Sequence, residues 1–187
     1  MKNGIFMKKA VVLLFDGVEE LEAVAPIDIL RRAGADVAVA AVAGTLSITG
    51  RSGLEIKCDA PFADVQNASF DVAVLAGGPG TDKVLADARV VRFFARHNAE
   101  GKIVAAICAA PVVLKAAGAL EGRRCTAHTS RVAELENCDV SAAVVRDGNV
   151  ITSRGAGTAV EFALEIVSAV FSEKTSKDVA RAICFMG

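Results

Sequence analysis

The chain has 187 residues and a net charge of −1, and 53% of its residues are hydrophobic against 23% charged. This composition predicts one globular domain with a sizeable core, spanning residues 1–187, and excludes a disordered chain. The near-zero charge argues against a partner such as nucleic acid or an anionic membrane, and without Trp and Tyr the chain lacks their stacking surfaces for bases.

The predicted elements alternate along the chain. In the first half they are a strand at 8–15, a helix at 19–34 that Pro26 should kink, a strand at 36–42, a side hairpin at 46–50 and 54–58, and a strand at 70–76. In the second half they are a helix at 88–101, a strand at 102–107 that turns directly into a helix, a strand at 124–128, a strand pair within 142–153, and helices at 157–171 and 176–186.

Apolar strands that alternate with helices are typical of a parallel sheet covered on both faces. In such α/β folds the active crevice lies at the carboxyl ends of the strands. The turns that should meet there are 16–18, 76–80, 107–110 and 128–130.

The N-terminus superficially resembles a secretion signal, but its apolar run, 10–15, is too short and acidic residues follow it at once. We expect residues 1–7 to be a frayed extension, with Met1 or Met7 as the start, and no run is long enough to cross a membrane. The cysteine count is odd and includes no C-x-x-C pair, which favours a reducing compartment, so we expect a cytoplasmic protein.

Cys108 lies where a buried strand turns into a helix. Pro111 favours the first helical turn and therefore predicts a helix start close to Cys108, with Ala109 in that turn. A thiol at the positive end of a helix should have a lowered pKa, and neighbouring amides can receive a developing oxyanion. We therefore interpret Cys108 as a nucleophile, and the other cysteines as inert residues: Cys58, Cys125, Cys138 and Cys184.

Glu22 is a second candidate, because it lies on the partly apolar face of the helix at 19–34. A carboxyl on such a face is costly unless it is protonated or paired, and a protonated Glu22 near Cys108 can donate to the thiolate and shuttle a proton. The alternative is a solvated glutamate. The pair Gly77–Gly78 can present bare amides to an anion, or be an ordinary turn.

Two histidines are present. His128 can pair with Cys108, or with Cys125 form half of a metal site; no second ligand pair is visible, so no metal is predicted. His97 is expected on the surface of an amphipathic helix. Arg154, in a Ser-Arg-Gly-Ala-Gly stretch that lacks the third glycine of a dinucleotide site, is either an anion partner or a packing residue.

Four segments together resemble the ThiJ/PfpI superfamily, and within it the DJ-one branch of parkinsonism-associated deglycases and their bacterial relatives. They are DGVEELEAVAPIDILRRAG, LAGGPG, AAICAAP and TSRGAGTAVEFALEIV. The resemblance covers about Lys9 to Ser168. It implies a flavodoxin-like three-layer α/β/α sandwich with a mainly parallel central sheet, a homodimer and no cofactor.

The resemblance also assigns roles to residues. It implies that Cys108 is the nucleophile and Glu22 its partner, and that His128 lies nearby. The amides that would surround the sulfur are those of Gly77, Gly78 and Ala109, and the helix arginines match Arg31 and Arg32, the latter reaching toward the partner's site. Gly50-Arg51-Ser52 stands where relatives often carry Cys-Ser-Arg, so an anion-binding arginine there is expected to be shifted or absent.

Two functions are compatible with these residues. The first is a glyoxalase or deglycase that attacks a small reactive carbonyl compound, such as methylglyoxal, with Cys108 and converts it through a hemithioacetal into a 2-hydroxyacid. Deglycation itself and scavenging of free aldehyde both stay open. The second is a redox-sensing stress protein or chaperone that acts through oxidation of Cys108 without turnover.

Overall fold

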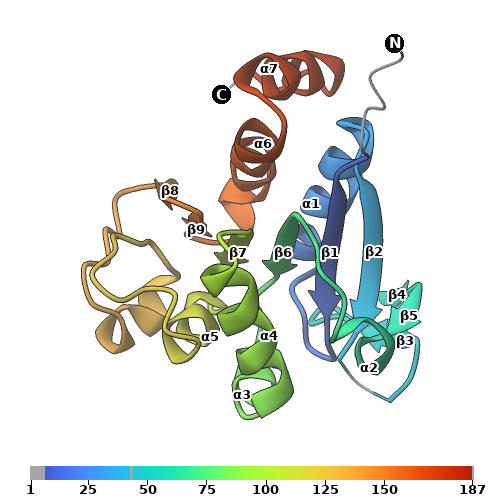
Figure 1. The fold of residues 1–187 in the computed structure, drawn as a ribbon, viewed down its shortest axis with the longest axis vertical. Helices are drawn as coiled ribbons and strands as arrows, with labels where there is room; N and C mark the ends of the chain where they lie inside the picture. Colours follow the sequence, from blue (N-terminus) through green and yellow to red (C-terminus); the bar gives the residue numbers. More distant parts are fainter. Residues whose placement is uncertain (1–6, 43, 187) are drawn as a thin grey trace.

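A computed structural model of the chain describes residues 7–42 and 44–186. Residues 1–6, most of the predicted N-terminal extension, lie outside the described part. Within it, seven strands form one sheet in the order β5-β2-β1-β6-β7-β9-β8, in which only the β8–β9 pairing is antiparallel (Figure 1). Their bounds are β1 (Lys9–Leu14), β2 (Asp36–Ala41), β5 (Ala60–Pro61), β6 (Val72–Leu75), β7 (Ile103–Ile107), β8 (Val144–Asp147) and β9 (Val150–Ser153).

Helices cover both faces of the sheet, as the sequence predicted. One layer consists of α1 (Glu20–Arg32), α6 (Ala159–Val170) and α7 (Glu173–Ala182), which pack on one another (Figure 1). The other consists of α2 (Phe62–Val65), α3 (Thr81–Leu85), α4 (Ala88–Ala99) and α5 (Pro111–Ala116). None of the described helices is both long enough and apolar enough to span a bilayer.

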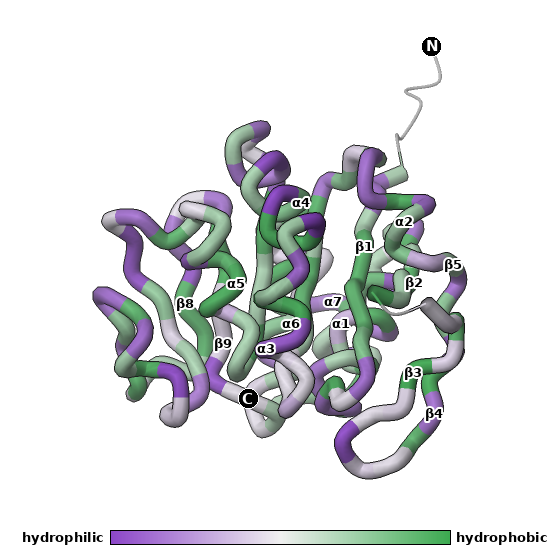
Figure 2. Tube along the Cα trace, turned by 90° about the horizontal axis from the view of Figure 1, so that it is seen from below, coloured by the Kyte–Doolittle hydropathy of each residue, from purple (hydrophilic) through white to green (hydrophobic). Residues whose placement is uncertain are grey.

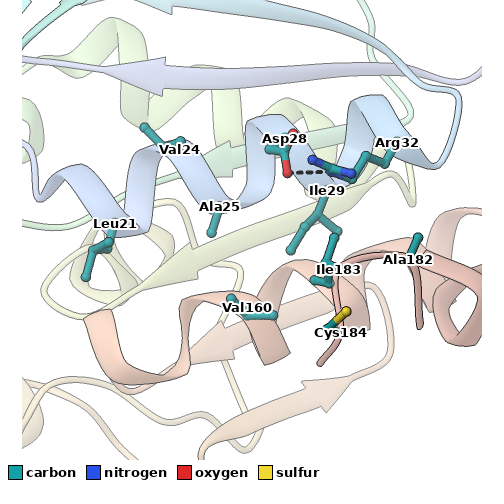
Figure 3. A pocket seen from close by; sticks show the side chains of 10 residues that line it. All are labelled: Leu21, Val24, Ala25, Asp28, Ile29, Arg32, Val160, Ala182, Ile183 and Cys184. Carbon is teal, nitrogen blue, oxygen red and sulfur yellow. Dashed lines mark hydrogen bonds and ion pairs between the residues drawn. The ribbon is translucent and has the colours of Figure 1, made fainter. Parts of the chain in front are cut away.

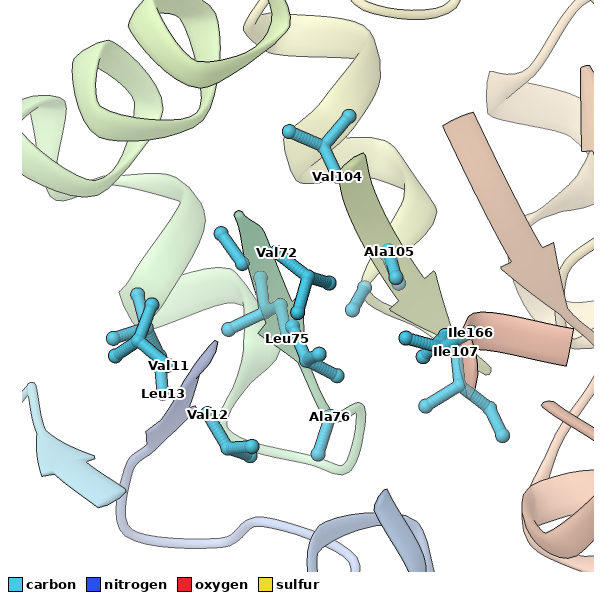
Figure 4. Packing of buried hydrophobic residues seen from close by; sticks show 14 of the residues in the cluster. Val11, Val12, Leu13, Val72, Leu75, Ala76, Val104, Ala105, Ile107 and Ile166 are labelled. Atoms are coloured by element: carbon cyan, nitrogen blue, oxygen red, sulfur yellow. The ribbon is translucent and has the colours of Figure 1, made fainter. Parts of the chain in front are cut away.

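The core lies between the sheet and these layers. β1, β6 and β7 are central parallel strands buried on both faces, which explains why their sequences are apolar almost throughout. Figure 4 shows their side chains packed together with Ile166 of α6, and β1 is a largely green, hydrophobic stretch in Figure 2. Since the three strands run in the same direction, their carboxyl ends meet at one edge of the sheet.

Several predicted elements differ from the structure. The hairpin is present as β3 (Ser47–Thr49) and β4 (Glu55–Lys57), but the last helix is α7, which begins earlier, after a Ser172 cap. The predicted strand at 124–128 is wrong: only Cys125 makes a single bridge, to Cys138. The reason is that β7 and β8 already occupy both edges of β9, so Thr126 bonds to the hydroxyl of Thr152 instead (2.9 Å).

The prediction that His97 lies on the surface is also wrong. Its side chain is fully buried on α4. The ring Nδ1 lies 2.8 Å from the carbonyl of Phe93, and Nε2 accepts from the amide of Phe70 (3.2 Å). Both ring nitrogens are satisfied in the neutral form, and burial lowers the pKa of His97.

Candidate active site

Cys108 occupies a tight turn directly after β7. Its φ of 64° lies in the left-handed region, which is uncommon for a residue with a side chain and is frequent at functional sites. The turn is held from two sides: the Cys108 amide donates to the carbonyl of Ser153 (2.8 Å), and the Cys108 carbonyl accepts from the amide of His128 (2.8 Å). The side chain is thereby fixed at the carboxyl edge of the sheet, half-buried.

The helix after this turn begins later than predicted. α5 starts at Pro111, which occupies its first position, and its cap is Ala110. Cys108 therefore precedes the helix by three residues, in a separate turn closed by the bond from the Ala110 amide to the Ile107 carbonyl (3.0 Å). The helix is also only six residues long, so its dipole offers little to the thiol.

Gly77 and Gly78 bring the loop after β6 against this turn. A Cβ on Gly77 would lie 2.7 Å from the carbonyl oxygen of Ile107 and 2.8 Å from the Ala109 nitrogen. Gly78 has φ 126°, and a Cβ there would lie 2.3 Å from the carbonyl oxygen of Gly17. Only residues without a side chain fit both places, so these glycines do more than make an ordinary turn.

Glu22 reaches the same place from α1. Its side chain is fully buried, which rules out the solvated alternative, and one carboxyl oxygen accepts from the Gly77 amide (2.9 Å). The other oxygen is buried and has no hydrogen-bond partner among the described residues. Burial raises the pKa of Glu22 to about 7, against smaller opposing effects of the Cys108 thiol and the Gly77 amide.

This geometry corrects one expectation about the amides. The Gly77 amide is occupied by Glu22 and does not face an oxyanion. The amides of Gly78 and Ala109, in contrast, donate to no protein oxygen within the described chain, and the Ala109 amide lowers the pKa of the neighbouring thiol. Two of the three predicted donors therefore remain for a substrate oxygen.

The pKa of Cys108 differs in direction from the prediction. Burial raises it to about 12, and the negative charge of Glu22 adds to this effect. The predicted lower pKa depended on a helix N-terminus that stabilises the Cys108 thiolate, and because α5 starts only at Pro111 this stabilisation is lost. A pKa raised in this way favours the thiol form, so a reaction at Cys108 would need a base to take the thiol proton.

A pocket of about 270 Å³ opens in front of the thiol. Its lining residues are Arg51, Gly78, Pro79, Thr81, Asp82, Cys108, Ala109, His128, Ser130 and Arg131. His128 is exposed, and its Nδ1 accepts from the Ser130 amide (3.3 Å) and lies 2.8 Å from the Ser130 hydroxyl oxygen. No bond joins its ring to the Cys108 sulfur within the described residues, so the predicted Cys–His pair is not formed here.

The arginines are distributed differently from the prediction. In the stretch Gly50-Arg51-Ser52, an anion-binding arginine was expected to be shifted or absent; Arg51 lines the pocket from that stretch, and its charge lowers the pKa of Glu22. Its backbone is held by a bond from the Arg51 amide to the carbonyl of Val18 (2.8 Å). Arg131, which the sequence did not single out, also lines the pocket and pairs with Asp82 (2.7 Å).

Two predicted arginines do not belong to this pocket. Arg32 pairs with Asp28 (2.6 Å) on α1 and lines a separate groove (Figure 3). Arg154 donates to the carbonyls of Val140 (3.4 Å) and Ser141 (3.3 Å), outside this pocket. Across the described residues, no group of three or more His, Cys, Asp or Glu side chains could hold a metal ion.

The groove that contains Arg32 lies between α1, α6 and α7 and has a volume of about 580 Å³ (Figure 3). Its floor is apolar, with Ile29 of α1 facing Ile183. Leu21 and Val24 extend this apolar surface along α1 and are 63% and 49% exposed.

The fold and the Cys–Glu arrangement define a class of α/β proteins with a cysteine at a strand–helix turn. A model of the DJ-1/PfpI family matches residues 8–169, and the chain belongs to this family, as its motifs predicted. Protein dj-1beta of Drosophila melanogaster is 38% identical over 181 residues, which cover 94% of this chain and 96% of that protein.

Other relatives are similar over nearly the whole chain. The glutathione-independent glyoxalase DJR-1.2 of Caenorhabditis elegans is 34% identical over 182 residues, covering 95% of this chain and 96% of that protein. The structure of oxidized Toxoplasma gondii DJ-1 superposes with a TM-score of 0.92 at 31% identity, covering 96% of this chain and 100% of that one, which confirms the predicted fold class. DJ-1 homolog A of Arabidopsis thaliana is longer: the chain spans 46% of its length.

Proposed function

We propose that this protein is a cofactor-independent glyoxalase that converts 2-oxoaldehydes such as methylglyoxal into 2-hydroxyacids at Cys108. The observation that carries the proposal is the Glu22 carboxyl, which is fully buried next to the Cys108 thiol and has one oxygen free of protein partners in the described chain. The name of the Caenorhabditis elegans relative supports the same reaction class.

In the first step Glu22 acts as a general base. Its carboxylate accepts the thiol proton while the Cys108 sulfur attacks the aldehyde carbon, because a thiol with a pKa of about 12 does not ionise alone at neutral pH. The carbonyl oxygen takes this proton from Glu22 and becomes the hydroxyl of a hemithioacetal, which returns Glu22 to the carboxylate, and the amides of Gly78 and Ala109 would donate to that oxygen.

In the second step Glu22 moves a proton between two carbons. It takes the proton from the hemithioacetal carbon and returns it to the neighbouring ketone carbon through an enediolate, while the hydroxyl proton moves to the ketone oxygen, which leaves a thioester of the 2-hydroxyacid. Water hydrolyses the thioester, so the net reaction adds one water to the oxoaldehyde and regenerates the thiol. A pKa of about 7 suits Glu22 for both directions of transfer.

The test is lactate formation from methylglyoxal by the purified protein without glutathione. We expect Cys108→Ser to abolish it and Glu22→Gln to lower kcat by about 10²-fold or more. Cys184→Ser is the matched control, since Cys184 lines the other groove, and should retain full activity. Lactate produced at the normal rate by Cys108→Ser would refute the proposal.

Deglycation is a separable question. If the protein acts on adducts directly, amine release from a glycated peptide should persist when excess free thiol traps methylglyoxal. Release that disappears under these conditions would mean that the protein only removes free aldehyde.

The redox-sensor function is the second candidate, supported by the oxidized state named for the Toxoplasma gondii relative. A protonated Glu22 could donate to a sulfinate at Cys108. The raised pKa of Cys108 argues against rapid oxidation, because susceptibility follows thiolate character. Mass spectrometry after mild peroxide distinguishes the two: a sensor requires that Cys108 gains oxygen before the other cysteines do.

We also propose that the protein is a homodimer that buries the exposed apolar surface of α1, where Leu21 and Val24 lie. Leu21→Glu should then produce monomers in sedimentation experiments, whereas the exposed Leu54→Glu on the hairpin side should leave the dimer intact. A monomeric unsubstituted protein would contradict this assignment.

A further inference from the structure

Cys125 and Cys138 lie directly opposite each other in a short parallel bridge. The Cys125 amide donates to the carbonyl of Asn137 (3.2 Å), and the Asp139 amide donates to the carbonyl of Cys125 (2.8 Å). Paired strands lie about 4.8 Å apart, which falls inside the Cα separation of about 4.4–6.8 Å that disulfides span. Opposite residues of such a bridge also project to the same side.

The two thiols are close enough to interact. Burial raises the pKa of Cys125 to about 12, and the neighbouring Cys138 side chain adds to this rise. Both are free thiols in the structure; Cys125 is fully buried, while Cys138 is only half-buried. A buried thiol beside an accessible one is the arrangement of a resolving and a reacting cysteine.

The backbone here can adjust to a covalent bond. The bridge is isolated and does not continue as a ladder, and Asn137 next to it has a left-handed φ of 49°. Movement of the 136–139 segment by a fraction of an ångström would therefore disturb no strand of the central sheet.

We infer that Cys125 and Cys138 form a second redox site, separate from Cys108, at which a peroxide produces a disulfide. The Cys138 sulfur attacks the peroxide, the O–O bond breaks, and the products are a sulfenic acid and one water. The Cys125 sulfur then attacks the sulfenic sulfur, the S–S bond forms, and the departing hydroxide takes the Cys125 proton as a second water. The two thiols thus supply the two electrons that reduce hydrogen peroxide to two waters.

The disulfide would act on the pocket because of what lies between the two cysteines. The loop from 125 to 138 contains η1 (Thr129–Glu134), and it supplies three pocket residues: His128, Ser130 and Arg131. In Figure 1 this loop lies between α5 and β8. Closing its base would restrain one wall of the Cys108 pocket, so oxidation at this site would change access to the nucleophile.

The sequence makes the test direct. Trypsin cleaves after Arg124, Arg131 and Arg146, which places Cys125 on peptide 125–131 and Cys138 on peptide 132–146. The experiment uses the full-length Cys108→Ser variant, so that oxidation of Cys108 does not interfere and failure of the proposed glyoxalase does not affect the outcome. The protein is treated with stoichiometric hydrogen peroxide, alkylated and digested without reductant.

We expect one linked species, lighter than the two free peptides by two hydrogen atoms, that dithiothreitol converts back into them. Adding Cys138→Ser should abolish it, while adding Cys184→Ser, which removes an exposed cysteine, should leave it unchanged. Hydrogen exchange of the 129–138 amides should slow several-fold in the oxidised protein. Accumulation of sulfinate at Cys138 without the linked species, or the same yield from urea-unfolded protein as from folded protein, would overturn the inference.

Discussion

Glu22→Gln tests whether the buried carboxyl has the raised pKa on which the mechanism depends. In the unfolded chain Glu22 titrates near 4.5, whereas in the folded protein burial raises its pKa to about 7. A group with a raised folded-state pKa contributes stability that is fully present below the unfolded pKa. That stability is lost as pH rises through the folded pKa. The unsubstituted protein should therefore lose stability between about pH 4.5 and pH 7, and the glutamine variant should lack this loss.

The size of the effect follows from the shift. The difference between 4.5 and about 7 corresponds to about 3 kcal/mol of unfolding free energy over the whole range. About 2.5 kcal/mol of this should appear between about pH 5 and pH 8. Because glutamine keeps the shape and can still accept from the Gly77 amide, the comparison isolates the charge.

The assay is urea unfolding of both proteins at several pH values. It is followed by circular dichroism, because the chain contains no Trp or Tyr. The stability difference between variant and parent should grow with pH by the amount given above, and titration of all other groups cancels in this subtraction. Glu20→Gln is a matched control two positions away. Burial raises the pKa of that carboxyl, but the hydrogen bonds from Ser52 outweigh burial and lower it below 4.5, so the Glu20→Gln difference should stay nearly constant between about pH 5 and pH 8. A Glu22→Gln difference that varies by less than about 0.5 kcal/mol would mean that Glu22 titrates normally, and the base role would fail with it.

Three further outcomes follow from the same structure. Gly77→Ala places a methyl carbon 2.7 Å from the carbonyl oxygen of Ile107, so we expect about 1–3 kcal/mol of destabilisation in urea unfolding and a reduced kcat. Burial lowers the pKa of His97 in the folded protein, so the stability that its neutral form contributes is fully present above the unfolded pKa of 6.5. The unfolding free energy should therefore fall as pH drops below 6.5. A His97→Gln variant whose unfolding free energy falls with pH as steeply as that of the parent would contradict this. The Arg51 charge lowers the pKa of Glu22, so Arg51→Ala should shift the acidic limb of the kcat/KM profile to higher pH, and an unshifted limb would show that Arg51 does not act on Glu22.

Most of the sheet was predictable because local pattern and tertiary environment agree there. The runs that became β1, β6 and β7 are apolar almost throughout, as strands buried on both faces must be. The segment at 124–128 has a similar apolar and β-prone character, yet it forms no strand because both edges of β9 are occupied. Which segments pair with a given strand depends on the whole fold, so it cannot be predicted from a short stretch of sequence.

The residues of the site were predictable from the sequence, but their pKa values were not. The positions of Cys108 and Glu22 follow from a strand–turn–proline pattern and from an acid on an apolar helix face. Their pKa values depend on burial and on mutual distance, which only the packed structure supplies. The same limit applies to His97. One ring nitrogen lies near the carbonyl of Phe93 in the same helix, and the other accepts from the amide of Phe70, which is far away in the sequence, so the helical pattern alone does not reveal these partners.

Gly77 links the position of Cys108 to the pKa of Glu22, because it contributes both a close backbone approach and a hydrogen-bond donor. Its bare α-carbon lets the loop after β6 approach Ile107 and Cys108, and its amide holds one oxygen of Glu22. A single bond of this kind fixes the direction of the carboxyl but leaves the second oxygen without a protein partner among the described residues. If several amides held that carboxylate, its pKa would fall and it would be a poor base at neutral pH. One bond together with full burial keeps the pKa near neutrality, and it keeps the free oxygen available for the proton that Cys108 must lose.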